Sequence, residues 1–248
     1  MSTRPKIAFF EFTCCEGCQL TVVDSLQTYP ELLDAVEIVQ FREAMSEKGD
    51  DYQIAFIEGS CTRTSDESRL KEIRERAKIV VALGACAHLG GVNAIVNRQS
   101  LSEALKYVYG DKKFEASQVR PIEAVITVDA FIPGCPIDRE EFIAVVKALL
   151  QGRRPFIPPY PVCVECKLKE NECLVLKDIL CLGSVVRAGC DALCTSVGIG
   201  CEGCRGLIPN PNVKALETTL AERGIKRAEI ETKEQLFMNY QFTESEKT

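Results

Sequence analysis

The chain has 248 residues, of which 46% are hydrophobic, and its formal net charge is −6 at neutral pH. This acidic balance argues against nucleic acid as a partner and leaves no basic face for an anionic membrane surface. No apolar stretch approaches the roughly 18 residues of a transmembrane helix, and the opening MSTRPKIAFFEF lacks a basic and apolar leader, so we expect no direct membrane insertion and a cytoplasmic protein with reduced thiols.

The first part of the chain, residues 1–152, alternates short β-rich runs with helical segments. The clearest helices are expected over Ser65–Ala77 and Asp138–Leu150, because their apolar residues recur at helical spacing. Alternation of this kind predicts an α/β domain with a mostly parallel sheet. The expected strands lie near residues 7–12, 36–41, 53–58, 79–84 and 123–129.

A proline-rich stretch over residues 153–161 then forbids helix and central strand, and we interpret it as a linker. Residues 162–210 are rich in glycine and cysteine and carry too few apolar residues for a core, so bound metal is expected to supply their folding free energy. The remaining residues, 211–248, predict a C-terminal helical tail with helices near 212–223 and 233–238.

Eight of the 14 cysteines are crowded between Cys163 and Cys204. Disulfides suit short secreted chains and do not fit this context. Zinc commonly uses Cys-x2-Cys pairs, but here the two pairs stand at the outer edges of the segment. Iron-sulfur clusters need four thiolates each and tolerate irregular spacing, so eight thiolates suffice for two [4Fe-4S] clusters. The eight are Cys163, Cys166, Cys173, Cys181, Cys190, Cys194, Cys201 and Cys204; grouping them in sequence order is the simplest division, and ligand exchange between clusters is the alternative.

Four further cysteines stand just past expected strands. Cys15 and Cys18 follow the first strand, Cys86 follows the run that ends at residue 84, and Cys135 follows the last one. The carboxyl ends of parallel strands meet at one edge of a sheet, where ligands bind. These four cysteines therefore predict a third cluster assembled from separated loops. Cys14, which could replace Cys15 as a ligand, and Cys61 stay outside this pattern.

Short motifs in the same region resemble the small, electron-transferring subunit of [NiFe] hydrogenases. They are Cys15-Glu16-Gly17-Cys18, Glu58-Gly59-Ser60, Gly84-Ala85-Cys86-Ala87 with Gly90-Gly91, and Pro133-Gly134-Cys135-Pro136, all within residues 7–137. The second half, with Cys163-Val164-Glu165-Cys166 and Arg187-Ala188-Gly189-Cys190, is similar to the cytoplasmic, cofactor-coupled branch of that family.

The resemblance implies a flavodoxin-like N-terminal domain that holds a proximal [4Fe-4S] cluster on Cys15, Cys18, Cys86 and Cys135. It also implies two further [4Fe-4S] clusters in the second domain, a large subunit with the Ni-Fe site as one partner, and an electron-acceptor subunit with flavin or iron-sulfur clusters as another. The chain would then be a non-catalytic, electron-transferring member of an oxidoreductase. Glu16 and Glu58 would lie near the interface with the large subunit, and solvated or structural roles are their alternatives.

Two departures of this sequence from the family's pattern leave alternatives open. The only histidine, His88, is not placed as a ligand of a distal cluster, so we expect all-cysteine ligation. The tandem Cys14-Cys15 resembles the quinone-site cluster subunit of respiratory complex I, which makes a complex I-like iron-sulfur subunit the second interpretation. A zinc-stabilised interaction module is the third.

Overall fold

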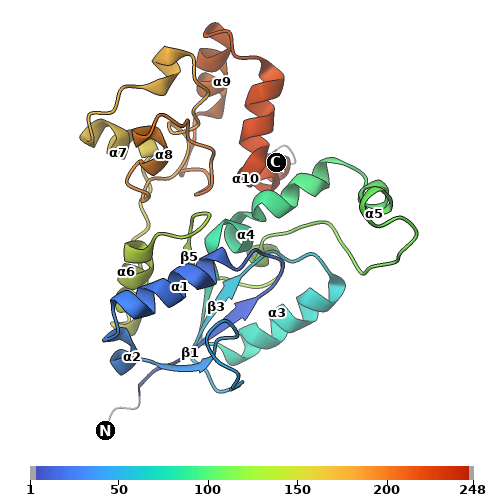
Figure 1. Ribbon diagram of the computed structural model, residues 1–248, viewed down its shortest axis with the longest axis vertical. Coiled ribbons are helices and arrows are strands. Elements are labelled where there is room, and N and C mark those ends of the chain that lie inside the picture. The colour runs from blue at the N-terminus through green and yellow to red at the C-terminus, as the bar shows by residue number, and fades with distance from the viewer. Residues whose placement is uncertain (1–3, 246–248) are drawn as a thin grey trace. The chain divides into compact units, whose positions relative to one another are not determined.

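The computed structural model describes residues 4–245 (Figure 1). Its chain divides into two compact units, one that ends at Pro155 and one that begins at Phe156, and each is described by itself. The first unit contains β1 (Lys6–Glu11), α1 (Gly17–Thr28), α2 (Leu32–Ala35), β2 (Glu37–Gln40), β3 (Ile54–Glu58), α3 (Thr64–Arg76), β4 (Ile79–Leu83), α4 (Gly84–Leu89), α5 (Leu101–Tyr109), β5 (Ala130–Ile132) and α6 (Arg139–Leu150), with 3-10 helices over Gly91–Arg98 and Ile122–Ala124.

The strands of the first unit form a five-stranded sheet in the order β2-β1-β3-β4-β5, and every pair is parallel. Phe9 of β1 pairs with Phe56 of β3, which in turn pairs with Val81 of β4. Because all strands run the same way, the segments that follow β1, β3, β4 and β5 leave the sheet at one edge. The predicted cysteine ligands of the first unit lie in the segments that leave the sheet at this edge.

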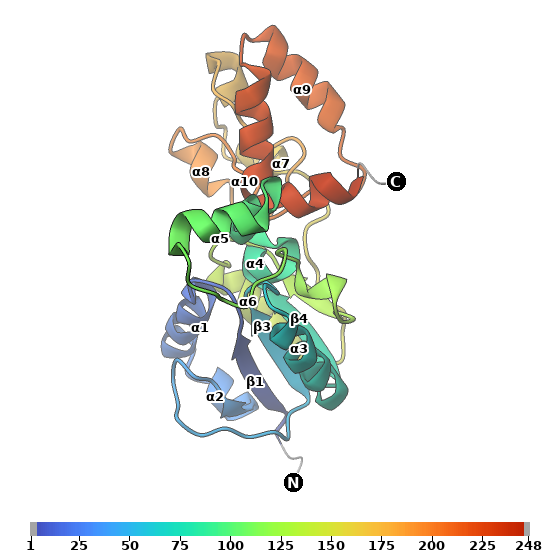
Figure 2. The same cartoon turned by 90° about the vertical axis from the view of Figure 1, so that its right-hand side faces the viewer.

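Both faces of the sheet are covered, as buried parallel sheets require. Figure 2 shows α1 and α3 on opposite sides of it, and α1 packs beside α6. On the α6 side, the ring of Phe9 stacks on Phe56 with centroids 5.0 Å apart and also contacts Phe142. On the α3 side, Leu70 and Ile73 pack into the core that holds the alternate strand residues.

The second unit has little regular structure of its own. Its helices are α7 (Val162–Leu168), α8 (Leu193–Ser196), α9 (Val213–Glu222) and α10 (Arg227–Ser245), with a 3-10 helix over Leu174–Lys177. Within the part of this unit that is described, extended backbone pairs only at single bridges, such as Pro161 with Arg187 and Val186 with Leu207. Most of residues 156–210 therefore follow an irregular path between the short helices.

Several predicted elements lie where expected. The helix predicted over Ser65–Ala77 is α3, and the helix predicted over Asp138–Leu150 is α6, with the Asp138 side chain accepting the Glu141 N–H as its N-cap. The first four predicted strands correspond to β1, β2, β3 and β4 within about two residues. The helix predicted near 212–223 is α9, which begins after the Asn212 cap.

Two predictions of secondary structure were wrong. Residues 123–129 do not form a strand: Ile126 N donates to the Ile122 carbonyl at 3.0 Å, as in a helical turn, and both side chains are buried. The strand of this region is β5, shifted to Ala130–Ile132. The helix predicted near 233–238 is much longer, because α10 spans Arg227–Ser245 with a kink at Met238; residues 246–248 lie outside the described part.

None of the helices in residues 4–245 is both long enough and apolar enough to cross a lipid bilayer.

Candidate functional site

Four predicted ligands lie at one edge of the sheet in the first unit. Cys15 and Cys18 follow β1, Cys86 is in the first turn of α4 after β4, and Cys135 follows β5. The β4–α4 turn and the loop before Cys135 touch, because Ala85 N donates to the Gly134 carbonyl at 2.7 Å. The parallel sheet thus brings together thiols that are up to 120 residues apart, from Cys15 to Cys135.

Glu58, the last residue of β3, holds the start of α1 in place. Its carboxylate accepts the N–H of Cys18 at 3.1 Å and the N–H of Gln19 at 2.9 Å. A helix N-terminus leaves such N–H groups without intrahelical partners, so a carboxylate there satisfies them and favours the helix dipole. Burial raises the pKa of Glu58, and these two backbone hydrogen bonds oppose that rise. Glu58 therefore fixes the position of the Cys18 backbone.

Glycines make room for the sulfur atoms. Gly84 has φ +82°, and a β-carbon there would collide with the Sγ of Cys18. A β-carbon on Gly91, with φ +56°, would lie 3.1 Å from the Sγ of Cys86, and one on Gly17 would lie 3.3 Å from the Sγ of Cys15. Gly84 and Gly91 thus combine a left-handed backbone with close approach to a thiol, which only glycine permits at low cost.

Burial disfavours the free thiolate at Cys18, Cys86 and Cys135 by raising the pKa of each thiol. Burial raises the pKa of Cys86 to about 12, and Cys135 is the largest electrostatic contributor to the same rise. Burial, followed by the charge of Glu58, raises the pKa of Cys18 as well. Metal ligation by cysteine requires the thiolate, so binding here would release protons and would depend on pH.

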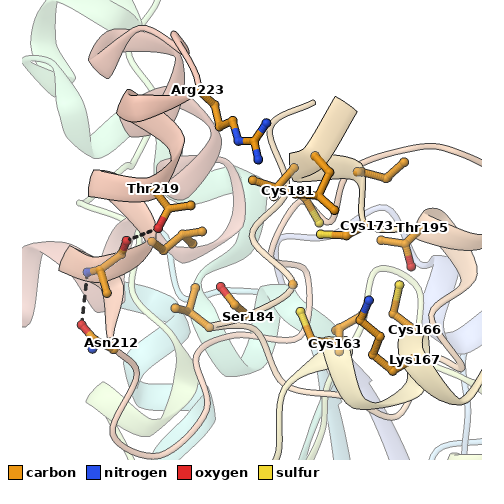
Figure 3. A pocket seen from close by; sticks show the side chains of 18 residues that line it. Cys163, Cys166, Lys167, Cys173, Cys181, Ser184, Thr195, Asn212, Thr219 and Arg223 are labelled. Carbon is orange, nitrogen blue, oxygen red and sulfur yellow. Dashed lines mark hydrogen bonds between the residues drawn. The ribbon is translucent and has the colours of Figure 1, made fainter. Parts of the chain in front are cut away.

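The second unit contains a cavity of about 470 Å³ whose wall includes Cys163, Cys166, Cys173 and Cys181. Figure 3 shows their sulfur atoms directed toward a common space. The rest of the wall is largely apolar and comes from α7, the 3-10 helix after Cys173, and α9. The predicted grouping of the first four cysteines in sequence order therefore corresponds to one cavity.

Of the other four cysteines of this unit, Cys190 and Cys204 lie near Cys201. Burial raises the pKa of Cys201 well above its ordinary value, and Cys181, Cys204 and Cys190 contribute to that rise electrostatically. The Cys201 N–H also donates to the Sγ of Cys181 at 3.2 Å. This hydrogen bond joins the two groups of cysteines, because Cys181 lies in the wall of the cavity.

Two charged residues of the second unit were not singled out from the sequence. Glu165, between Cys163 and Cys166, accepts the N–H of Gly189 at 2.6 Å and the N–H of Ala192 at 3.1 Å. Arg205 is only 1% exposed and donates from Nε to the Ala188 carbonyl at 2.8 Å. The sequence signal for Glu165 was its position inside a Cys-x2-Cys pair, but nothing in the sequence indicates its partners.

The remaining predicted residues have simpler surroundings. Cys61 is fully buried and its thiol donates to the Arg63 carbonyl at 3.7 Å. Cys14 is half-buried, and its thiol donates to the Phe12 carbonyl at 3.5 Å. His88 stacks on Phe131 with ring centroids 3.9 Å apart. None of the 14 cysteines forms a disulfide, and among residues 4–245 no three Cys, His, Asp or Glu side chains converge on a point suited to a single metal ion.

Comparison with known proteins gives a consistent class. Residues 15–149 match the family described as NADH ubiquinone oxidoreductase, 20 Kd subunit. Sulfhydrogenase 2 subunit delta of Pyrococcus furiosus is 38% identical to the chain, with 88% of the chain and 92% of the relative covered. A subunit of the vhu F420-non-reducing hydrogenase of Methanococcus voltae is 30% identical, over 97% and 96% of the two chains.

A solved structure agrees with these relatives. A chain of an NAD+-reducing [NiFe]-hydrogenase in the H2-reduced state superposes with a TM-score of 0.56 at 27% identity, over 63% of this chain and 96% of that one. The chain belongs to the family of the 20 kDa subunit of NADH-ubiquinone oxidoreductase. Its relatives named here are hydrogenase subunits, and the predicted resemblance to a hydrogenase small, electron-transferring subunit is confirmed.

Proposed function

We propose that this chain is the electron-relay subunit of a [NiFe] hydrogenase, with a flavodoxin-like first unit and an iron-sulfur second unit. The strand order β2-β1-β3-β4-β5 supports the flavodoxin-like assignment, since it is the order of that doubly wound fold. The observation that carries the proposal is the assembly of cysteines from separate segments around shared spaces, in a chain similar to hydrogenase subunits over most of its length.

The residues fit three [4Fe-4S] clusters, each with four cysteine ligands. In the first unit, the proposed ligands are Cys15, Cys18, Cys86 and Cys135, and the adjacent glycines leave the sulfur atoms unobstructed. In the second unit, one set of proposed ligands is Cys163, Cys166, Cys173 and Cys181. The cavity that they line, of about 470 Å³, is large enough for one cluster. The other group is Cys190, Cys194, Cys201 and Cys204.

When bound, such clusters supply one-electron oxidation and reduction. The protein's own part is to hold the thiolates, exclude water and set the charge around them. Apolar residues of the cavity wall, including Leu174 and Leu216, would reduce the contact of the sulfur atoms with water. The Cys201 N–H donates a hydrogen bond to the Cys181 sulfur, which stabilises negative charge there. We expect electrons to pass between the Ni-Fe site of a large subunit and a further subunit with flavin or iron-sulfur clusters, in the cytoplasm.

Metal analysis of anaerobically purified protein tests this proposal. We expect about twelve iron atoms and about twelve acid-labile sulfides per chain. Cys135→Ser should remove or alter one of the clusters seen by EPR and leave the other two. Cys61→Ser is the matched control, because Cys61 lies in the same unit at the end of a strand but outside the proposed ligands. Zinc without sulfide would contradict the proposal and support the interaction module.

A second candidate is an iron-sulfur subunit of a quinone-reducing assembly like complex I. The description of the matched family favours it, but that match ends at residue 149. The similarity to sulfhydrogenase 2 subunit delta covers 88% of the chain and so must extend into the second unit. Co-purification with a Ni-Fe large subunit would favour the hydrogenase, whereas co-purification with a quinone-binding membrane assembly would favour this candidate.

A further inference from the structure

Glu165 links the two groups of cysteines in the second unit. It lies in α7 between Cys163 and Cys166, which line the cavity. Its carboxylate reaches the loop that carries Cys190: Oε1 accepts the Gly189 N–H at 2.6 Å, and Oε2 accepts the Ala192 N–H at 3.1 Å. The same Oε2 lies 4.0 Å from the Sγ of Cys190. One side chain thus touches the backbone on both sides of a proposed ligand.

The loop that Glu165 holds has an unusual backbone. Gly189, Asp191 and Ala192 all have positive φ, at 110°, 54° and 50°. For Asp191 and Ala192, which carry a β-carbon, this left-handed conformation costs free energy and persists only where the surroundings stabilise it. Amide groups that converge from such a loop form a site for an anion, and here the Glu165 carboxylate occupies it.

Two further charged residues contact this loop. Lys169, after α7, pairs with Asp191 at 2.6 Å, but Asp191 is largely exposed, and exposed ion pairs contribute little. Arg205, which is buried, donates a hydrogen bond to the Ala188 carbonyl. The Cys190 loop therefore has a carboxylate on its amides and a guanidinium on a carbonyl, so charges of opposite sign flank the proposed ligand.

We infer that Glu165 is a positioning residue that holds the Cys190 loop and, through its negative charge beside the Cys190 sulfur, makes the reduction potential of the cluster bound there more negative. The physical reason is that a nearby negative charge disfavours the addition of an electron, and cluster potentials respond to local charge and hydrogen bonds. This inference rests on the proposed function, because it requires a cluster on Cys190. It adds a specific residue that influences the potential of the cluster on Cys190.

Redox titration followed by EPR on the anaerobically purified holo-protein tests the inference. Glu165→Gln keeps the shape of the side chain and one acceptor oxygen but removes the charge. We expect it to retain the wild-type iron content and to shift the midpoint potential of the cluster on Cys190 to a more positive value, by more than the potential of either other cluster. Glu170→Gln is the matched control, because Glu170 is an exposed carboxylate of the same segment, and it should leave every potential unchanged.

Two further variants separate charge from structure. Glu165→Ala removes both acceptor oxygens and should lose about one third of the iron, or about four atoms of twelve, together with faster hydrogen exchange of residues 187–194. If Glu165→Gln also loses that iron, Glu165→Asp, which keeps the charge, should retain it. Loss of the cluster from both Glu165→Gln and Glu165→Asp would overturn the inference.

The decisive contrary result is a set of wild-type midpoint potentials in Glu165→Gln, whatever Glu165→Ala does. A glutamate with a purely structural role would lose iron in the alanine variant and leave the potentials of the glutamine variant unchanged. Failure of the proposed function is distinguishable from this outcome, because the wild-type protein itself would then lack iron and sulfide.

Discussion

The two units of this protein are stabilised in different ways. Among the described residues, the largest fully buried side chains include Phe9, Phe56 and Phe142, and all the apolar members of that set lie in the first unit, whereas the second unit contributes only Arg205. The second unit instead surrounds a cavity with cysteines. A sheet with two covered faces buries apolar surface without a cofactor, whereas under the proposed function the cysteine-lined cavity would gain stabilising contacts when a cluster fills it.

The largest expected effect comes from removing iron and sulfide from the whole protein. The second unit should lose most of its hydrogen-exchange protection, because under the proposed function cluster binding contributes to its folding free energy. The amides of β1, β3 and β4 should remain protected, since their partners are other strands. Hydrogen exchange read by mass spectrometry on holo- and apo-protein measures both. Equal loss of protection in the two units would show that the comparison is wrong.

Truncation of a core aromatic should instead destabilise the first unit and spare the second unit. Phe9→Ala removes a ring that is 1% exposed and contacts Phe41, Phe56 and Phe142, so we expect the first unit to lose about 3–5 kcal/mol of unfolding free energy. Denaturant titration of the holo-protein measures this loss. Phe156→Ala, at a side chain 71% exposed in the second unit, is the control and should change stability by less than about 0.5 kcal/mol.

A single methyl group at the sheet edge should separate stability from cofactor binding. Gly84→Ala places a β-carbon against the Cys18 sulfur at a backbone with φ +82°. We expect a loss of about 1–3 kcal/mol and of about four iron atoms per chain. Gly110→Ala has a similar φ of +64° but no neighbour within 4 Å, so it should lose stability alone. Full iron content in Gly84→Ala would argue against a cluster at Cys18.

The smallest expected effect is a pH dependence in the second unit. Burial raises the pKa of Glu234 from 4.5 to about 7, with Glu217 and Glu231 adding to the rise. The folded state therefore favours the neutral carboxyl, and the stability this contributes is present below about pH 4.5 and is lost as the pH rises to about 7.

Replacement of Glu234 by glutamine imitates the neutral form at every pH. Thermal unfolding should show Glu234→Gln more stable than wild type by about 1–2 kcal/mol at pH 8, with a smaller difference at pH 5.5. Glu229→Gln, at an exposed position of the same helix, serves as the control. A gain that is equal at both pH values would mean that the charge of Glu234 is not its cause.

Sequence periodicity correctly predicted secondary structure where a helix packs one face against the sheet. The helix α3 was predicted because Leu70 and Ile73 face the sheet at helical spacing, and both are buried. The same reasoning was wrong at residues 123–129, where a run of β-branched residues suggested a strand. There, Ile122 and Ile126 anchor a helical turn, and the sheet accepts only Ala130–Ile132 as its edge strand. Local propensity did not indicate how much of the run the sheet could pair.

The sequence by itself indicated four of the five strands and the helices α3 and α6 of the first unit, and it placed Cys15, Cys86 and Cys135 just after strands, because these are local patterns. Only the tertiary structure decided which remote groups meet. It placed Gly84 against Cys18, put Cys163 and Cys181 in the wall of one cavity, and bound Glu165 to the loop around Cys190. These contacts depend on the packing of segments far apart in the chain, and no periodicity in the sequence encodes that packing.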